Sequence, residues 1–304
     1  MRSGTRWTPF IAALAFQAVA TAPITAVAQD GDAEAHEDSR WTPALSAFSG
    51  LQIQDRKARI ESAERGVVEG DSTAVFGFVG FSAELATPAL SGAAGRPRLF
   101  VHADASYSFD SEEAVANEGS PGPLEERGPP SNPNQPPPVG AVTGQGSSVK
   151  VEAQPLVISA GVGFAFSLEA WQRAFRIKPS LEWLWQEDQV TGQMGVAESI
   201  ADPGNPQGQC PCRKVLVESS RSHGFHSIGP GLEIEMDAAR AGPMMLSLYA
   251  SGQAHHVLGD RTVELTGTGT FDDGSRDVSF VSSYEHEPWR FRAGVGLRFR
   301  WVPE

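Results

Sequence analysis

Cysteine is almost absent from this chain, so covalent cross-links do not hold the fold together. Cys210 and Cys212 are the only two among 304 residues, and they flank Pro211 in a stretch rich in Gly, Pro and Gln. A local disulfide and a soft-metal site are the two interpretations. Two sulfurs without further ligands nearby are a weak metal signal, and oxidising surroundings favour the disulfide. We therefore expect no disulfide framework, no metal and no cofactor.

Long hydrophobic runs are also missing after the N-terminus, where no segment offers the 18 or more apolar residues of a membrane-spanning helix. The segment 1–28 has the layout of a cleavable signal peptide. Arg2 and Arg6 precede an apolar run at 10–20, and small residues occupy 26–28. Export through the Sec pathway is expected, with cleavage after residue 28. No cysteine stands directly after the cleavage point to carry a lipid, so the mature protein either stays in the periplasm or crosses a membrane as strands.

Positive charge is scarce. The net charge is −13, with 24 bases against 37 acids, and it becomes −15 when Arg2 and Arg6 leave with the signal peptide. A surface of this sign disfavours nucleic-acid partners. The frequent Gly and Pro (32 and 22) indicate a β-rich chain with turns and loops. We expect a flexible acidic leader at 29–43, followed by one domain over 44–304.

What the chain does contain is alternation of apolar with polar or small residues at period two, the signature of β-strands. In the last segment, for example, Trp289, Phe291 and Val295 alternate with Arg290 and Arg292. Such alternation predicts an all-β antiparallel sheet with one apolar face and one polar face. The eight segments that show it are 45–54, 73–86, 98–109, 156–168, 175–186, 227–236, 244–255 and 289–301.

The connections between the segments alternate in length. Short turns are expected near 91–97, 169–173 and 237–243, and long loops near 55–72, 110–148, 190–215 and 259–288. Aromatic residues gather at both ends of the segments, in two girdles of the kind that a bilayer interface favours. Short turns on one side and long loops on the other are typical of outer-membrane β-barrels. The sequence therefore predicts about eight transmembrane strands, with long extracellular loops and short periplasmic turns.

One hairpin leaves the strand number open between eight and ten. Asp272, Asp273 and Gly274 read better as a turn than as a calcium loop, because the remaining acidic spacing of such a loop is missing. The flanking runs 263–271 and 278–284 then form a β-ribbon. If the ribbon projects beyond the membrane, the barrel has eight strands. If the ribbon inserts, the barrel has ten.

The polar face of the segments carries full charges, which suit the narrow lumen of a small barrel rather than its lipid-facing side. The strongest expected cluster joins Arg176 and Lys178 to Glu233 and Glu235 on the next segment. A salt-bridged plug is the favoured interpretation, and a conducting or catalytic lumen is the alternative. The predicted lumen charge network consists of Glu84, Arg98, Asp104, Arg176, Lys178, Glu182, Glu233, Glu235, Arg290, Arg292, Arg298 and Arg300.

The C-terminal run 294–301 resembles the assembly signal of outer-membrane barrels, in which aromatics follow a glycine at three and five residues. Gly296, Phe299 and Trp301 occupy those positions. With the eight segments, the chain resembles the small barrels of the OmpA-domain, OmpX and OmpW kind. The resemblance implies a monomer in outer-membrane lipid that is delivered by periplasmic chaperones and inserted by the barrel assembly machinery. It departs at the end, where 302–304 follow the last aromatic.

No constellation of residues demands an enzyme. Known outer-membrane lipid A deacylases carry a His-x-Ser pattern on one strand face. Here Ser227 directly follows His226, so the two side chains point to opposite faces. His102 and His255 are predicted inward as hydrogen-bonding groups. We expect a non-catalytic barrel with a structural or surface-binding role through its external loops. OmpW-like passage of small apolar molecules is the second hypothesis, and a membrane-embedded lipid-modifying enzyme is the third.

The terminal aromatics give a first testable prediction. Phe299 and Trp301 both belong to the assembly signal and to the periplasmic girdle. Changing both to Ala is expected to lower the amount of folded protein in the outer membrane, measured as the heat-modifiable band on a gel. Wild-type levels of the double variant would contradict the assignment.

Overall fold

The computed structural model describes residues 40–90, 97–109, 112–124, 144–170, 173–199 and 212–302. The predicted signal peptide and nearly all of the predicted leader lie outside these ranges. No helix in the described part is long and apolar enough to cross a membrane. The strands are β1 (Thr42–Ser62), β2 (Gly66–Ala86), β3 (Arg98–Ser108), β4 (Glu112–Gly119), β5 (Gly146–Ala170), β6 (Arg173–Ser199), β7 (Cys212–Ala241), β8 (Met244–Leu258), β9 (Thr262–Thr270) and β10 (Asp277–Trp301).

Eight of these strands close into a ring, in the order β1-β2-β3-β5-β6-β7-β8-β10. β10 pairs back onto β1 from Ala44↔Arg300 to Ser62↔Phe280, and every pairing is antiparallel. β4 continues alongside β5 where β3 ends, and β9 continues alongside β10 where β8 ends. The predicted all-β barrel of eight strands is confirmed. The ten-stranded alternative is wrong, because the hairpin of β9 and β10 leaves the ring instead of joining it.

We call the part of the ring nearer the C-terminus the lower part. It has an apolar exterior and a polar interior. Outward-facing side chains remain exposed here although they are large and hydrophobic, as at Phe81 (74%), Leu45 (66%) and Tyr107 (54%). Trp41, Phe164, Phe299 and Trp301 mark one edge of this band, and Tyr107, Phe109, Trp183 and Trp289 mark the other. This lower part has the arrangement of an outer-membrane β-barrel, in which lipid replaces water around the apolar face.

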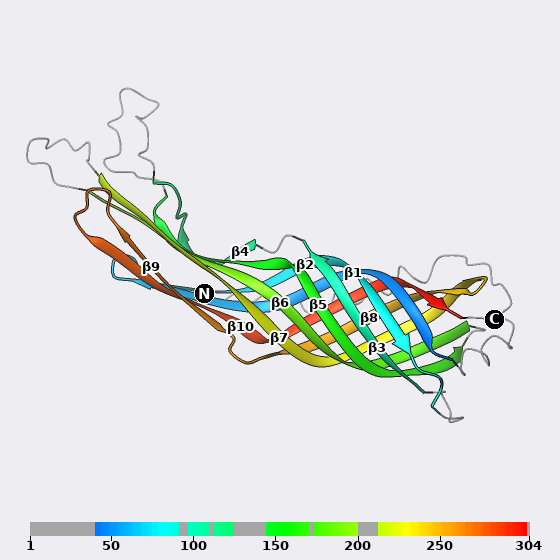
Figure 1. The fold of residues 1–304 in the computed structure, drawn as a ribbon. Helices are drawn as coiled ribbons and strands as arrows, with labels where there is room; N and C mark the ends of the chain where they lie inside the picture. The colour runs from blue at the N-terminus through cyan, green and yellow to red at the C-terminus, as the bar shows by residue number, and fades with distance from the viewer. Residues whose placement is uncertain are drawn as a thin grey trace, which may run out of the picture.

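Short connections gather at one end of the barrel, beside the C-terminal end of β10 (Figure 1). The β7–β8 turn consists of Gly242 and Pro243, and Gly242 has a φ of 58°. The backbone N–H of Val302 donates to the carbonyl oxygen of Pro243 over 2.7 Å, which fastens the chain end to this turn. The strand ends that flank the three short turns expected near 91–97, 169–173 and 237–243 all lie at this end.

Parts of the long loops predicted at the other end are strand within the described residues, which corrects the sequence analysis. β1 and β2 run on until only 63–65 separates them, so the expected loop 55–72 is a tight turn. β4 and the start of β5 take up parts of 110–148, and β6 and β7 extend into 190–215. Strand β1 also begins at Thr42, two residues inside the predicted leader. A membrane needs about 9–11 residues per strand, and β7 has 30. The strands therefore rise far beyond the apolar band.

Above the band the ring separates into two sheets. The upper parts of β4, β5, β6 and β7 form one sheet, and β9 with the upper parts of β10, β1 and β2 forms the other. No hydrogen-bonded ladder joins β2 to β4 or β7 to β9 within the described residues. The upper part is thus a four-on-four β-sandwich that continues directly from the barrel, and we call it the head (Figure 1).

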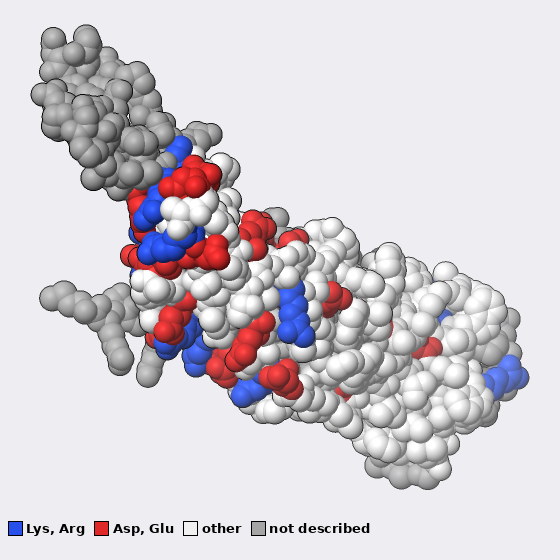
Figure 2. Space-filling model, turned by 60° about the vertical axis from the view of Figure 1, so that its left-hand side comes forward, with Lys and Arg blue, Asp and Glu red and all other residues white. Residues whose placement is uncertain are grey.

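The polarity of the strand faces inverts between the barrel and the head. On β1 the inward row runs Ser46, Gln52 and Arg56 in the barrel and then becomes apolar at Ala58 and Ile60. The outward row changes in the opposite sense, from Leu45, Leu51 and Ile53 to Asp55, Lys57, Arg59 and Glu61. Charged side chains accordingly gather over the head, while the barrel surface is mostly free of them (Figure 2).

A single apolar core fills the head between its two sheets. Tyr284, Phe280 and Phe225 are among its largest members, each with no more than 1% of its surface exposed. The other members come from the eight strands of the head, from the top of β8 and from one turn. They are Ala58, Ile60, Val68, Val115, Ala116, Val149, Val151, Val190, Met194, Val196, Val215, Val217, Val257, Val263, Leu265, Phe271 and Val278.

The predicted hairpin at 272–274 is present at the outer end of the head. Gly274, with a φ of 71°, lies in the turn between β9 and β10. The backbone N–H of Asp272 donates to the carbonyl oxygen of Lys214, and its carboxylate accepts the Lys214 backbone N–H, both over 3.0 Å. The guanidinium of Arg213 lies 4.8 Å from the centroid of the Phe271 ring. These contacts tie the hairpin to β7 and close the core at its tip.

The inversion of polarity predicts how the head responds to mutation. Phe280→Ala removes a ring from the sealed core and is expected to destabilise the head by about 3–5 kcal/mol. Hydrogen exchange should show faster exchange in β9 and the upper part of β10, with the barrel strands still protected. The neighbour Val281 is 55% exposed on the opposite face. Val281→Ala is the matched control, and equal effects of the two changes would contradict the inversion.

Candidate functional site

The lumen of the barrel holds every charged residue of the predicted network. Each of the twelve side chains comes from an inward position of its strand, and most are almost completely buried. Arg98 lies at the short-turn mouth, where its guanidinium donates to the Thr42 hydroxyl over 2.6 Å and to the Arg40 carbonyl over 2.9 Å. The other eleven are distributed over three levels, which are described here from the short-turn end upwards.

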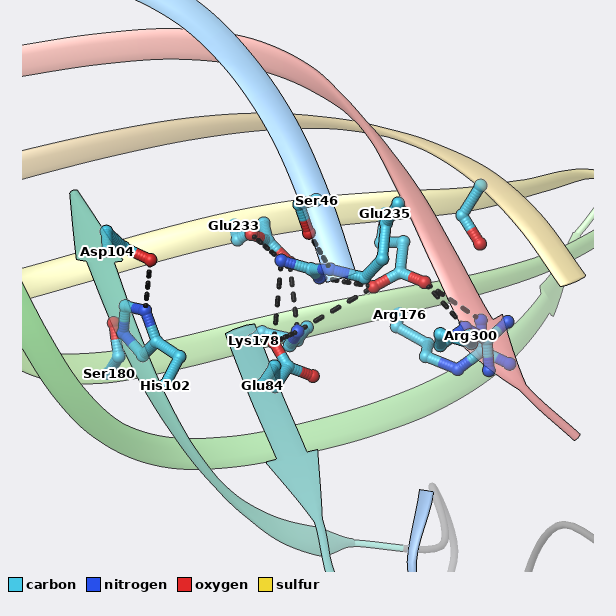
Figure 3. Close-up of polar contacts among 12 residues, drawn as sticks. Ser46, Glu84, His102, Asp104, Arg176, Lys178, Ser180, Glu233, Glu235 and Arg300 are labelled. Carbon is cyan, nitrogen blue, oxygen red and sulfur yellow. Dashed lines mark hydrogen bonds and ion pairs between the residues drawn. The ribbon is translucent and has the colours of Figure 1, made fainter. Parts of the chain in front are cut away.

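Glu235 lies at the centre of the first level (Figure 3). Its side chain is fully buried, and its carboxylate lies 2.6 Å from Arg298, 3.0 Å from Arg300 and 3.5 Å from Arg176. The nitrogen of Lys178 is 3.7 Å away. Four cations from two strands, β6 and β10, therefore converge on one carboxylate. These cations compensate the cost of burying the charged form of Glu235.

Three further acids complete this level. Lys178 Nζ lies 2.5 Å from Glu84 and 3.0 Å from Glu233, and Arg298 contacts both of these carboxylates. The Arg298 Nε–H also donates to the Ser46 hydroxyl over 2.9 Å. The predicted juxtaposition of Arg176 and Lys178 with Glu233 and Glu235 is thus present, and Glu84 and Arg298 extend it across the lumen.

Asp237 is the fourth acid, and the sequence analysis missed it by assigning it to the turn after β7. Its carboxylate accepts hydrogen bonds from Arg176 over 2.7 and 3.1 Å, from Arg300 over 2.5 Å and from Ser247 over 2.7 Å. A bulge in β7 next to Asp237 sets this register. With Asp237 included, four acids face four bases, and the level is electrically balanced.

His102 organises the second level. Its Nδ1 lies 3.2 Å from Asp104, and its Nε2 lies 2.8 Å from Glu182. The hydroxyl of Ser159 donates to Asp104 over 3.0 Å, and Ser180 donates to Glu182. A cavity of about 50 Å³ adjoins these groups. A space of that size holds a few water molecules and excludes larger ligands.

The third level consists mainly of amides and arginines. Gln186 accepts hydrogen bonds from Gln52 over 2.8 Å and from Arg290 over 3.0 Å. A second nitrogen of Arg290 lies 2.8 Å from the ring nitrogen of His286. Arg292 donates to the Ser106 hydroxyl over 3.0 Å and lies over the Phe78 ring.

Two further polar groups sit where the lumen meets the head. Tyr284 donates to Asp188 over 3.0 Å, and Arg56 is completely buried nearby on β1. The sequence analysis missed Arg56, Asp188 and His286, because all three lie outside the segments it used. Inward and outward positions continue to alternate on β1 past position 54, and this alternation could have identified Arg56.

Most of the charged side chains in the lumen form ion pairs or hydrogen bonds with one another. No three His, Cys, Asp or Glu side chains of the described ranges form a metal-binding group. His226 is exposed on the outside of the barrel and Ser227 is buried inside it, so the two face opposite sides as predicted. His102 and His255 both point inward. Cys210 and the side chain of Cys212 lie outside the described residues.

The three residues of the predicted assembly signal occupy both faces of β10. Gly296 points inward beneath the Tyr249 ring, and a Cβ atom at this position would lie 2.6 Å from that ring and 2.7 Å from the Ala47 carbonyl oxygen. A side chain is therefore excluded there. Phe299 and Trp301 point outward and are 43% and 49% exposed at the lower edge of the apolar band.

No family model and no curated protein matches this chain. Solved structures similar to it include the outer-membrane protease OmpT from Escherichia coli, at 10% identity and a TM-score of 0.30, over 86% of this chain and 97% of that one. A major outer-membrane protein from Thermus thermophilus is similar at 13% identity and a TM-score of 0.28, over 84% and 99%. Ail from Yersinia pestis is similar at 10% and 0.21, over 84% and 98%. At these scores the likeness carries no argument about function.

The position of Glu235 predicts a large penalty for its neutralisation. Glu235→Gln keeps the shape but leaves Arg298 and Arg300 without their shared buried carboxylate. It is expected to lower the free energy of unfolding by about 3–5 kcal/mol, measured by urea titration of the folded barrel in lipid. The control Glu285→Gln breaks a contact to Arg261 at 3.8 Å in the head, with both side chains partly exposed. A penalty of about 1 kcal/mol or less is expected there, and equal penalties would contradict the network.

Proposed function

We propose that this chain is an integral outer-membrane barrel that does not conduct and that holds a rigid β-sandwich above the cell surface, where it has a structural or surface-binding role. The observation that carries the proposal is the inversion of polarity along continuous strands. An apolar exterior over a polar lumen suits lipid, whereas a charged exterior over an apolar core suits water. One chain carries both patterns, with the change at the same height on neighbouring strands.

The orientation follows from the connections. Periplasmic turns of such barrels are short, and the structure on the other side is longer. The short connections lie at the end of the barrel away from the head, so this end faces the periplasm and the head faces outward. Outer-membrane lipid surrounds the band in this arrangement, and a single chain suffices to close the barrel.

A closed lumen supports an anchoring role over transport. The balanced first level lies across the short-turn end, and the sealed core of the head lies across the other. Passage of small apolar molecules requires an apolar route, yet the lumen between these two barriers is lined by charged and amide groups. An embedded enzyme requires a reactive group beside a space for substrate, and the lumen cavity has room only for water.

Fractionation tests the location. Expressed in a Gram-negative host with its own signal sequence, the protein is expected in outer-membrane fractions, and unboiled samples should migrate differently from boiled ones on gels. Recovery as soluble periplasmic protein would contradict membrane insertion.

Conductance tests the closed lumen. Purified barrel in planar bilayers is expected to give no steady ion current, because paired charges fill one end and an apolar core fills the other. The control is the same preparation after boiling, which reports the leak caused by unfolded protein. Reproducible single-channel steps from the folded sample alone would favour a transport role instead.

A further inference from the structure

The two sheets of the head meet along two seams, one between β2 and β4 and one between β7 and β9. The two seams differ in how closely their strands approach. Along β2 and β4 the backbones touch, since a Cβ atom at Gly70 would lie 2.0 Å from the Val115 carbonyl oxygen. Between β7 and β9 only the outer half is closed, where a Cβ atom at Gly267 or Gly269 would lie 2.9 Å from the Val217 side chain. The lower half of this second seam opens into a crevice of about 320 Å³, lined by Arg221, His223, Asp260, Thr262, Val263 and Glu264.

Arg221 and His223 break the pattern of their strand. The inward row of β7 is apolar at Val215 and Val217 and again at Phe225, all three buried in the core of the head. Arg221 and His223 occupy the same row, but Arg221 is exposed and His223 is half-buried because the crevice opens at their level. Charged residues in a core-facing row are the kind of local exception that marks functional positions.

The opposite wall of the crevice is acidic. Glu264 is exposed on β9, and Asp260 lies in the connection before it, where its carboxylate accepts the backbone N–H of Thr262 over 2.9 Å. Arg221 and Glu264 form no side-chain ion pair or hydrogen bond with any described residue. A guanidinium and an imidazole on one side and carboxylates on the other thus face one space, and Arg221 and Glu264 form no ion pair across it.

The crevice lies directly above the apolar band. His226 is three residues below His223 on β7, stacked against Trp183 in the outer girdle at 5.8 Å between ring centroids. Three residues of strand span about 10 Å. Leu258, which is 45% exposed, precedes Asp260 by two residues at the top of β8. In a bilayer-inserted barrel, this height belongs to the polar head groups of the outer leaflet.

We propose that the crevice between β7 and β9 binds a zwitterionic head group that combines a phosphate with a primary amine. Arg221 and His223 suit the phosphate, since guanidinium and imidazole nitrogens donate hydrogen bonds to phosphate oxygens. Glu264 and Asp260 suit the ammonium. A head group with phosphate alone places its negative charge beside the carboxylates without compensation. The lipid form of this ligand rests on the proposed membrane insertion, whereas the head-group chemistry does not.

Lipid selectivity is the first test. The folded protein is placed in nanodiscs with equal amounts of phosphatidylethanolamine and phosphatidylglycerol, and the lipids that remain bound are counted by native mass spectrometry. The wild type is expected to retain phosphatidylethanolamine in preference. Arg221→Gln should reduce its retention about tenfold, the size of effect that loss of one charge-assisted contact produces. Glu264→Gln should remove the preference by admitting phosphatidylglycerol.

Matched charge changes away from the crevice provide the control. Arg59 and Glu69 form an exposed pair at 2.8 Å on β1 and β2. Arg59→Gln and Glu69→Gln are expected to retain lipids like the wild type. Equal retention of both lipids by the wild type, or equal effects of the crevice and control variants, would overturn the lipid proposal.

A soluble probe separates this inference from membrane insertion. O-phosphoethanolamine is titrated onto the detergent-folded protein while the ring protons of His223 are followed by NMR, with inorganic phosphate as comparison. A saturable shift that is stronger for O-phosphoethanolamine and is lost in Arg221→Gln supports the site, even if the nanodisc test fails. A shift of equal strength with both probes, or none with either, would overturn the head-group chemistry.

Discussion

Closure of the hydrogen-bonded ring is the constraint on which the rest of this structure depends. Within hydrocarbon no water is available to backbone N–H and C=O groups, so a sheet that crosses a bilayer must have no free edge. The pairing of β10 with β1 meets this requirement along the whole apolar band. Above the band water satisfies free edges, and there the ring parts between β7 and β9 and between β2 and β4. The same strands form the head where a free sheet edge is allowed.

The closed ring also dictates what fills the lumen. Its outward positions must be apolar, and with a period of two the polar positions face a space only wide enough for side chains. Buried charges are tolerated only with partners. Arg298 illustrates the solution, since it contacts Glu84, Glu233 and Glu235 while its guanidinium lies over the Tyr249 ring. Removing any of these acids takes a partner from a buried cation.

The barrel was predictable from the sequence because a lipid-facing row keeps one polarity over a whole segment. The head was not, because the rows exchange polarity within β1 between Ile53 and Ala58. The outward apolar row ends at Asp55, which predicts a loop there, although the strand continues to Ser62. Asp237 was missed for a related reason, since a β-bulge beside it shifts the register near the turn. Gly296 was noticed as part of a motif, but its packing beneath Tyr249 is visible only in three dimensions.

The unbroken strands between membrane and tip have a mechanical consequence. β7 carries 30 residues from the outer tip to the periplasmic turn without an intervening linker, and β6 and β10 are similarly long. The head therefore has no hinge at its base, and its height above the lipid is fixed by the number of residues in each strand. A pulling force at the tip acts along the strands, so neighbouring ladders share it in shear. A load on the head is thus passed directly to the wall of the barrel.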